Sequence, residues 1–171
     1  MKALIQAGGK GTRLQSITGS LPKPMVQVGG KPILQWQVES LVKNGVSEIT
    51  IVISPTGQSI KDYFKDGAAF GAKITYLVEE TPLGTAGILF EAKSLLKDDD
   101  FILLFGDLML NIDWKRMIAF HEDKKAKLTA FAHPNSHPFD SDLLVVDGND
   151  MVISFDSKHN VRTWFYENLT T

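Results

Sequence analysis

KALIQAGGKGTRL, residues 2–14, is the stretch that decides the expected fold. A short apolar run that stops at three glycines within four positions indicates a buried strand and then a loop whose backbone approaches another group closely. Successive N–H groups of such a loop can point into one concavity, and Lys10, Arg13 and Lys23 add three cations nearby. The alternative is a tight turn with solvated basic residues. Arg13 and Lys23 favour a site for a phosphate chain.

Two familiar phosphate-binding motifs do not match this sequence. A P-loop needs Gly, four residues and then Gly-Lys-Ser/Thr, and neither Gly9-Lys10-Gly11 nor Gly30-Lys31-Pro32 completes it. A dinucleotide fingerprint needs a third glycine three residues after Gly11, where this chain has Leu14. The loop is therefore of another kind.

AGGKGTRL at residues 7–14, followed by PKP at residues 22–24, resembles the signature of the sugar-1-phosphate nucleotidyltransferases, also called NDP-sugar pyrophosphorylases. The pair of motifs is far more specific than a lone glycine-rich loop. The resemblance implies a nucleotide site and two catalytic cations, Arg13 on the β- and γ-phosphates and Lys23 on the α-phosphate. The expected nucleotide-binding residues of the loop are Ala7, Gly8, Gly9, Lys10, Gly11 and Thr12.

Composition limits the class of protein. A chain of 171 residues that is 43% hydrophobic can bury one core, which favours a single domain. A net charge of −2 argues against nucleic acid or an anionic membrane as partner. The lack of cysteine excludes disulfides and thiolate metal sites, and we find no signal peptide or bilayer-spanning stretch. We expect a soluble, cytoplasmic protein.

Strand and helix patterns alternate along the chain. After the first strand, we expect strands at residues 25–28, 48–53, 73–78, 101–105 and 127–133, helices at 32–44, 59–64, 113–124 and from the loop 79–87 to about 96, and a hairpin of 143–146 with 151–155. This alternation predicts a Rossmann-like three-layer α/β/α fold with a mostly parallel sheet that becomes mixed near its end. In such sheets ligands bind beyond the C-terminal ends of the strands.

That rule gathers the glycine loop, residues 79–87 and Asp107 at one edge of the sheet. Asp107 follows a buried strand and a glycine, where a carboxylate can hold a hard cation such as Mg²⁺ between protein and phosphates. A turn or helix cap is the alternative for Gly-Asp alone. In the resembled family the aspartate of this Gly-Asp is a metal ligand, which implies the same role for Asp107. Asp113 is expected to be the N-cap of the helix that begins at Trp114.

The loop at residues 79–87 resembles the nucleoside-binding loop of the family. Its expected nucleotide-binding residues are Glu79, Pro82, Gly84 and Thr85. Glu79 or Glu80 could accept hydrogen bonds from the N1–H and N2–H₂ groups of guanine, which favours GTP as the nucleotide. A surface glutamate without a ligand is the alternative.

Two further segments carry expectations. Lys158 lies where the family has a lysine that meets the sugar 1-phosphate, although Ser157 and His159 replace the usual flanking residues. Residues 133–143 resemble the mannose- or heptose-1-phosphate guanylyltransferase branch. A metal cluster of His133, His137 and Asp140 is conceivable there, but histidines beside prolines in a loop are usually solvated.

The expected activity joins an NTP, with GTP favoured, to a sugar 1-phosphate and releases pyrophosphate. An oxidoreductase with a glycine-rich first turn and a non-catalytic nucleotide-binding or truncated member of the same fold are the alternatives. Residues 1–171 are expected to form one nucleotidyltransferase domain that lacks its C-terminal sugar-binding part, and it could form a homo-oligomer.

Overall fold

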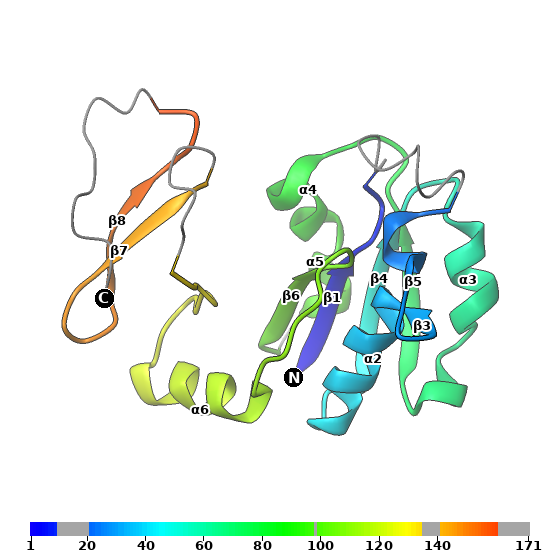
Figure 1. The fold of residues 1–171 in the computed structure, drawn as a ribbon, viewed down its shortest axis with the longest axis horizontal. Coiled ribbons are helices and arrows are strands. Elements are labelled where there is room, and N and C mark those ends of the chain that lie inside the picture. The colour runs from blue at the N-terminus through cyan, green and yellow to red at the C-terminus, as the bar shows by residue number, and fades with distance from the viewer. Residues whose placement is uncertain (10–20, 98, 135–140, 161–171) are drawn as a thin grey trace. The chain divides into compact units, whose positions relative to one another are not determined.

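A computed structural model describes residues 1–9, 21–97, 99–134 and 141–160 (Figure 1). The chain separates into two compact units, Met1–Ala119 and Phe120–Thr171, which are described one at a time. In the described part, no helix combines the length and the apolar composition needed to cross a membrane.

A four-stranded parallel sheet is the centre of the first unit. Its strands are β1 (Lys2–Gln6), β4 (Glu48–Ile53), β5 (Lys73–Val78) and β6 (Phe101–Phe105), in the order β5-β4-β1-β6. The bounds of β4, β5 and β6 match the prediction, because strands covered on both faces are nearly continuous runs of apolar residues. The alternating order around β1 requires crossover connections, as expected for this fold class.

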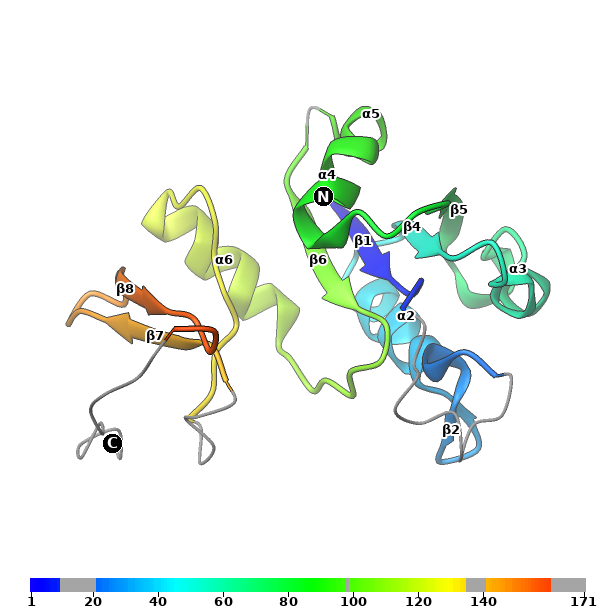
Figure 2. The ribbon, with the colours of Figure 1, turned by 90° about the horizontal axis from the view of Figure 1, so that it is seen from above.

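Helices cover both faces of this sheet. They are α2 (Ile33–Lys43) and α3 (Gln58–Phe64) on one face, and α4 (Gly84–Glu91) and α5 (Lys93–Leu96) on the other. Figure 2 shows α2 and the α4–α5 pair on opposite sides of β1. Successive side chains of each strand alternate between two buried clusters. The larger includes Ile5, Ile51, Leu34, Val38 and Phe64, and the smaller includes Leu4, Val52, Ile88, Ala92 and Leu96. The predicted three-layer α/β/α fold is confirmed.

The segment before α2 is shorter and more broken than expected. The predicted strand at 25–28 is a 3₁₀ turn, η2 (Lys23–Met25), followed by β2 (Gln27–Val28), which pairs with β3 (Lys31–Pro32). Gly29 and Gly30 make the predicted turn with φ of +61° and +85°, a conformation that glycine adopts without strain. Pro32 caps α2 instead of being its first residue.

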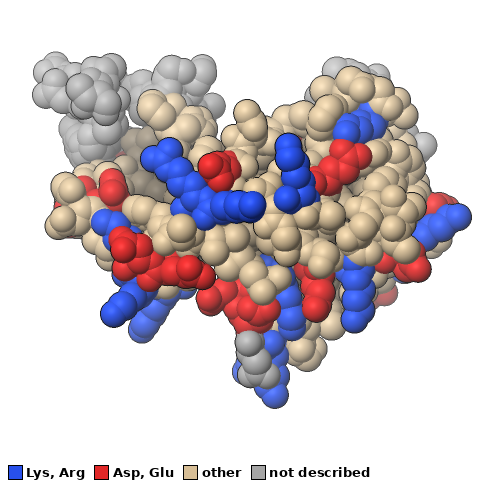
Figure 3. Space-filling view, turned by 90° about the horizontal axis from the view of Figure 1, so that it is seen from below, with Lys and Arg blue, Asp and Glu red and all other residues tan. Residues whose placement is uncertain are grey.

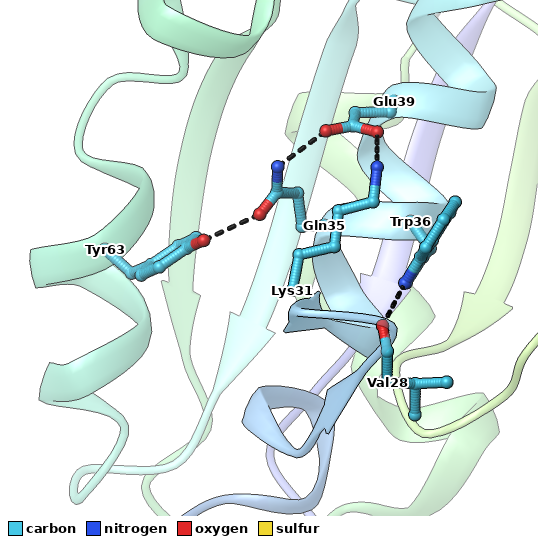
Figure 4. A network of polar contacts seen from close by, with 6 residues as sticks. All are labelled: Val28, Lys31, Gln35, Trp36, Glu39 and Tyr63. Carbon is cyan, nitrogen blue, oxygen red and sulfur yellow. Dashed lines mark hydrogen bonds and ion pairs between the residues drawn. The ribbon is translucent and has the colours of Figure 1, made fainter.

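The β2–β3 hairpin is attached to α2 through Trp36. The indole Nε1 donates to the Val28 carbonyl at 2.8 Å, and the Lys31 ammonium lies 3.7 Å from the centre of the indole ring (Figure 4). Both contacts join the loop that follows Lys23 to a helix of the core. They limit where that loop can lie.

The same lysine begins a polar chain that reaches α3. Lys31 forms an ion pair with Glu39, Gln35 donates to Glu39 at 2.6 Å, and the Tyr63 hydroxyl donates to Gln35 at 2.6 Å (Figure 4). Burial raises the pKa of Glu39, but the hydrogen bonds from Lys31 and Gln35 and the ammonium charge hold it below the ordinary value of 4.5. The network therefore favours the ionised carboxylate in the folded protein.

Charged side chains of opposite sign are interspersed on the face that Figure 3 shows. In the first unit, the amino terminus forms an ion pair with Asp99 at 2.7 Å.

The second unit contains a hairpin and the C-terminal part of α6 (Trp114–Lys124), whose first turns belong to the first unit. Arg116 N–H donates to the Asp113 carboxylate at 3.0 Å, so Asp113 is the N-cap of α6 as predicted. The hairpin of β7 (Leu143–Val146) and β8 (Val152–Asp156) is also confirmed. It forms a two-stranded sheet of its own in the described residues, so the central sheet there is wholly parallel, without the expected mixed end.

The strand predicted at residues 127–133 was wrong, because this segment is irregular. Leu128 is 81% exposed and Phe131 58% exposed. A strand needs a partner for its backbone, and no described strand pairs with this segment. Its β-branched and aromatic residues are not enough without that partner.

The Glu39 network makes a prediction for acid stability. Because the pKa of Glu39 is lowered on folding, its stabilising effect is complete above pH 4.5 and is lost as the pH falls through the folded pKa. Glu39→Gln should abolish this acid-dependent loss of unfolding free energy. We expect the loss to be below about 1 kcal/mol, because the ion pair is partly exposed. Urea unfolding of both proteins at pH 7 and pH 3.5 measures it, and an equal change in both would contradict the prediction.

Candidate active site

Backbone hydrogen bonds continue past the ends of the strands at the C-terminal edge of the sheet. Ala7 N–H donates to Val52 at 2.8 Å, Gly106 N–H to Gln6 at 2.8 Å, and Glu79 N–H to Ile53 at 2.9 Å. These bonds hold the starts of three loops side by side. The structure therefore brings together, at one edge, the starts of the glycine loop, of residues 79–87 and of the Asp107 turn, as the sequence predicts.

The first two glycines of the loop have different surroundings. A Cβ on Gly8 would lie 3.2 Å from the Ser54 nitrogen, 3.3 Å from the Ile53 carbonyl carbon and 3.4 Å from a Glu79 carboxylate oxygen. A Cβ on Gly9 would meet no described atom within 4 Å. A side chain at position 8 would thus crowd the backbone at the end of β4, whereas none of the described residues crowds position 9.

The rest of the loop lies outside the described residues. This applies to four of the predicted site residues: Lys10, Gly11, Thr12 and Arg13. Their roles stay predictions.

Lys23 and Asp107 meet at this edge although they are far apart in the sequence. The Lys23 ammonium lies 3.8 Å from the Asp107 carboxylate, and the two side chains are 25% and 44% exposed. Gly106 permits the arrangement, because a Cβ there would lie 3.2 Å from Ala7, Gln6 and Pro24. The result is a cation and a carboxylate that both remain open to solvent.

Gln37 is a residue that the sequence analysis missed. It is 4% exposed on α2, and its amide nitrogen donates to the Phe105 carbonyl at 2.9 Å and to the Leu108 carbonyl at 2.6 Å. The available signal was a glutamine among the apolar residues of the buried face of a predicted helix. A buried amide of that kind needs hydrogen-bond partners elsewhere in the fold.

Glu79 holds the loop before α4. Its carboxylate accepts a hydrogen bond from Leu83 N–H at 2.9 Å. The helix then begins at Gly84, with φ of +70°, inside the segment predicted as loop, and Thr85 lies in its first turn. Pro82 and Gly84 are exposed. One oxygen of Glu79 is therefore engaged by the loop itself, and the predicted contact with a base would fall on its other oxygen or on the exposed Glu80.

Lys158 belongs to the second unit, in the exposed segment after β8. Its backbone N–H donates to Asp142 at 2.9 Å, and this hydrogen bond lowers the pKa of Asp142. His133 contacts the Pro134 carbonyl at 2.8 Å, whereas His137 and Asp140 lie outside the described residues. In the described part of the chain, no three His, Asp or Glu side chains are grouped closely enough to hold a metal by themselves.

Comparison with known proteins adds to this geometry. A family model described as "Nucleotidyl transferase" matches residues 2–163. The chain belongs to the nucleotidyl transferase family. The resemblance of residues 7–14 and 22–24 to these proteins is thereby confirmed, and the Rossmann-like fold agrees with it.

The relatives of this chain are named for different nucleotides. The chain is 38% identical over 159 residues to D-glycero-alpha-D-manno-heptose 1-phosphate guanylyltransferase of Campylobacter jejuni subsp. jejuni, with 92% of this chain and 69% of that protein covered. It is 32% identical over 175 residues to UTP–glucose-1-phosphate uridylyltransferase of Synechocystis, with 95% and 45% covered. The chain spans less than half of this second relative.

A solved structure supports the same assignment. HddC from Yersinia pseudotuberculosis, complexed with GMP-PN, matches the nucleotidyl transferase with a TM-score of 0.73 and 29% identity, over 91% of this chain and 68% of that one.

The surroundings of Gly8 and Gly9 predict different effects of an alanine substitution, on stability at Gly8 and on nucleotide binding at Gly9. Gly8→Ala should lower the free energy of unfolding by about 1–2 kcal/mol, because crowding against the backbone of β4 outweighs the smaller entropy gain. Gly9→Ala should leave stability within about 0.5 kcal/mol but weaken binding of a nucleoside triphosphate, because its Cβ enters the open space. Denaturant unfolding and a GTP titration measure both. Equal effects of the two variants on stability would contradict the assignment.

Proposed function

We propose that this chain carries the nucleotide-binding face of a sugar-1-phosphate nucleotidyltransferase that uses GTP and a mannose- or heptose-type sugar 1-phosphate. Membership of the family and the guanylyltransferase relative support it. The observation that carries the proposal is the meeting of Lys23 and Asp107 beside the glycine loop, at the edge of the sheet where ligands of such folds bind.

The proposed reaction is one in-line displacement at phosphorus. A phosphate oxygen of the sugar 1-phosphate forms a bond to the α-phosphorus of the NTP, and the bond from that phosphorus to the bridging oxygen of pyrophosphate breaks with its electron pair. The products are an NDP-sugar and pyrophosphate. No covalent protein intermediate is required, so the protein's task is to position two anions and to stabilise the charge that develops between them.

In this proposal, different residues of the first unit bind different phosphates of the NTP. The N–H groups of the glycine loop and Arg13 bind the β- and γ-phosphates, and Lys23 neutralises the α-phosphate. Lys23 is suited to this because its ammonium is solvent-accessible and its carboxylate partner is 3.8 Å away, so that it can exchange one anion for another. We also propose that Lys158 binds the sugar 1-phosphate, as the resemblance to the family implies.

Asp107 suits a divalent cation, and we propose Mg²⁺. Its exposed carboxylate is a hard oxygen ligand, and Mg²⁺ usually takes one or two carboxylates together with substrate phosphates and water instead of a cage of protein ligands. A bound divalent cation would stabilise negative charge on the phosphate oxygens as a Lewis acid.

The proposed preference for guanine rests on two kinds of support. The Campylobacter relative is named a guanylyltransferase, and the Yersinia structure contains GMP-PN. Glu80 is exposed beside the loop that opens α4, where a carboxylate can accept hydrogen bonds from the N1–H and N2–H₂ groups of guanine.

A substrate panel tests the function. Pyrophosphate release is measured with GTP, ATP, CTP and UTP, each combined with mannose, glucose and heptose 1-phosphates. We expect release with GTP and a mannose or heptose 1-phosphate, and little with other pairs. GTP binding without pyrophosphate release from any pair would indicate a non-catalytic nucleotide-binding protein instead, and release with UTP or CTP alone would contradict the proposed base.

Asp107→Asn tests the cation site. The amide keeps the size of the side chain but loses the charge that a hard cation requires, so Mg²⁺-dependent kcat should fall on the order of 10²-fold or more. Metal-free GTP binding should survive, because the loop and Lys23 are unchanged. Wild-type turnover with the wild-type Mg²⁺ dependence would show that Asp107 only shapes the turn.

A further inference from the structure

Gln37 is a buried polar side chain on an apolar helix face. It is 4% exposed, and its neighbours along this face of α2, Leu34, Val38 and Leu41, are fully buried. Placing an amide in such surroundings costs free energy unless hydrogen bonds compensate. Leucine or methionine would fill the same space without that cost, so the packing of α2 alone does not account for a glutamine here.

The hydrogen bonds of Gln37 go to the turn that carries Asp107. The amide nitrogen donates to the carbonyl of Phe105, where β6 ends, at 2.9 Å and to the carbonyl of Leu108 at 2.6 Å. These two residues flank Gly106 and Asp107. One side chain from α2 thus joins both ends of a four-residue turn.

The turn has weak support from its own backbone. Leu108 N–H lies 3.3 Å from the Phe105 carbonyl, at the long end of the range for a hydrogen bond. Gly106 N–H donates to the Gln6 carbonyl at 2.8 Å, which fixes the start of the turn, and Gln37 holds its end through the Leu108 carbonyl. The conformation of Asp107 therefore depends on both bonds of the Gln37 amide.

The oxygen of the same amide adds a cost that the two bonds of the nitrogen have to offset. Gln37 Oε1 is buried and has no hydrogen-bond partner among the described residues. An unsatisfied buried acceptor is unfavourable, so the donor side of the amide has to outweigh it. Gln37 binds backbone carbonyls and does not use the Asp107 carboxylate, which is 44% exposed and faces Lys23.

We propose that Gln37 is a positioning residue, which holds the turn of residues 105–108 so that the Asp107 carboxylate is preorganised for a divalent cation beside the nucleotide phosphates. The proposal rests on the cation-binding role proposed for Asp107. Groups that orient a metal ligand without touching the metal change metal affinity or activity by about 10–100-fold when they are removed. Gln37 has that position, one backbone step from the ligand.

The test compares two identical substitutions on one helix. Gln37→Met keeps the volume and removes both donors to the turn. Gln35→Met is the matched control, because Gln35 lies two residues away and donates to Glu39 instead. Mn²⁺ is the probe, and its affinity for the protein with GTP is measured by water-proton relaxation, alongside thermal unfolding and the metal dependence of pyrophosphate release.

We expect Gln37→Met to weaken Mn²⁺ binding by about tenfold, with folding retained and a raised metal requirement for turnover. Gln35→Met should leave Mn²⁺ affinity unchanged, because Gln35 does not contact the turn. In an Asp107→Asn background, Gln37→Met should have no further effect on Mn²⁺ affinity, because it acts through that carboxylate. A merely structural role would change the melting temperature in both variants and Mn²⁺ affinity in neither.

The outcomes separate this inference from the proposed function. If Asp107→Asn weakens Mn²⁺ binding but folded Gln37→Met does not, the positioning role is wrong and the cation site stands. If Asp107→Asn has no effect on Mn²⁺ affinity, the cation site itself is wrong. Gln37→Asn is a second variant, one methylene shorter, that keeps the amide but cannot reach both carbonyls. Failure of both Gln37 variants to fold would also overturn the proposal, because the side chain would then serve the fold as a whole.

Discussion

Pairing of β1 on both of its edges is the constraint on which the first unit depends. Its backbone bonds β4 on one side and β6 on the other, and its side chains alternate between two buried layers. A strand in this position cannot shift by one residue without sending its apolar side chains to the wrong layers. The glycine loop therefore starts from a point that the register fixes, next to the ends of both neighbouring strands.

Close backbone approach at that point explains the residue types there. Gly8 lies against β4, and Gly106 lies against Ala7 and Pro24, so a Cβ at either position would lie within 3.2 Å of a neighbouring atom. Among the described residues here, Lys23 and Asp107 are partly exposed to solvent, at 25% and 44%. At the C-terminal edge of the sheet, closely packed backbone therefore carries charged side chains that can exchange partners.

The sequence predicts most of the fold and part of the site, for identifiable reasons. The strands at 48–53, 73–78 and 101–105 are predictable because each is a short apolar run bounded by turn residues. The segment 127–133 has the same local signal, but pairing depends on a partner that local sequence does not specify. Asp107 follows from the rule that places ligands at strand ends, and Lys23 from the resemblance of residues 22–24 to the family signature. Gln37 does not, because its partners are backbone carbonyls, which no residue type reveals.

The strand order also bears on how the chain acquires this structure. Both neighbours of β1 come later in the chain, since Ala3 pairs with Ile49 and Lys2 with Phe101. On the ribosome β1 emerges before β4 and β6, and both of its edges are covered only after β6 has been synthesised. Pairings between such distant residues form slowly. During this interval β1, which leads into the glycine loop, is an apolar strand with unpaired edges. A chaperone or a strand of another nascent chain can bind it.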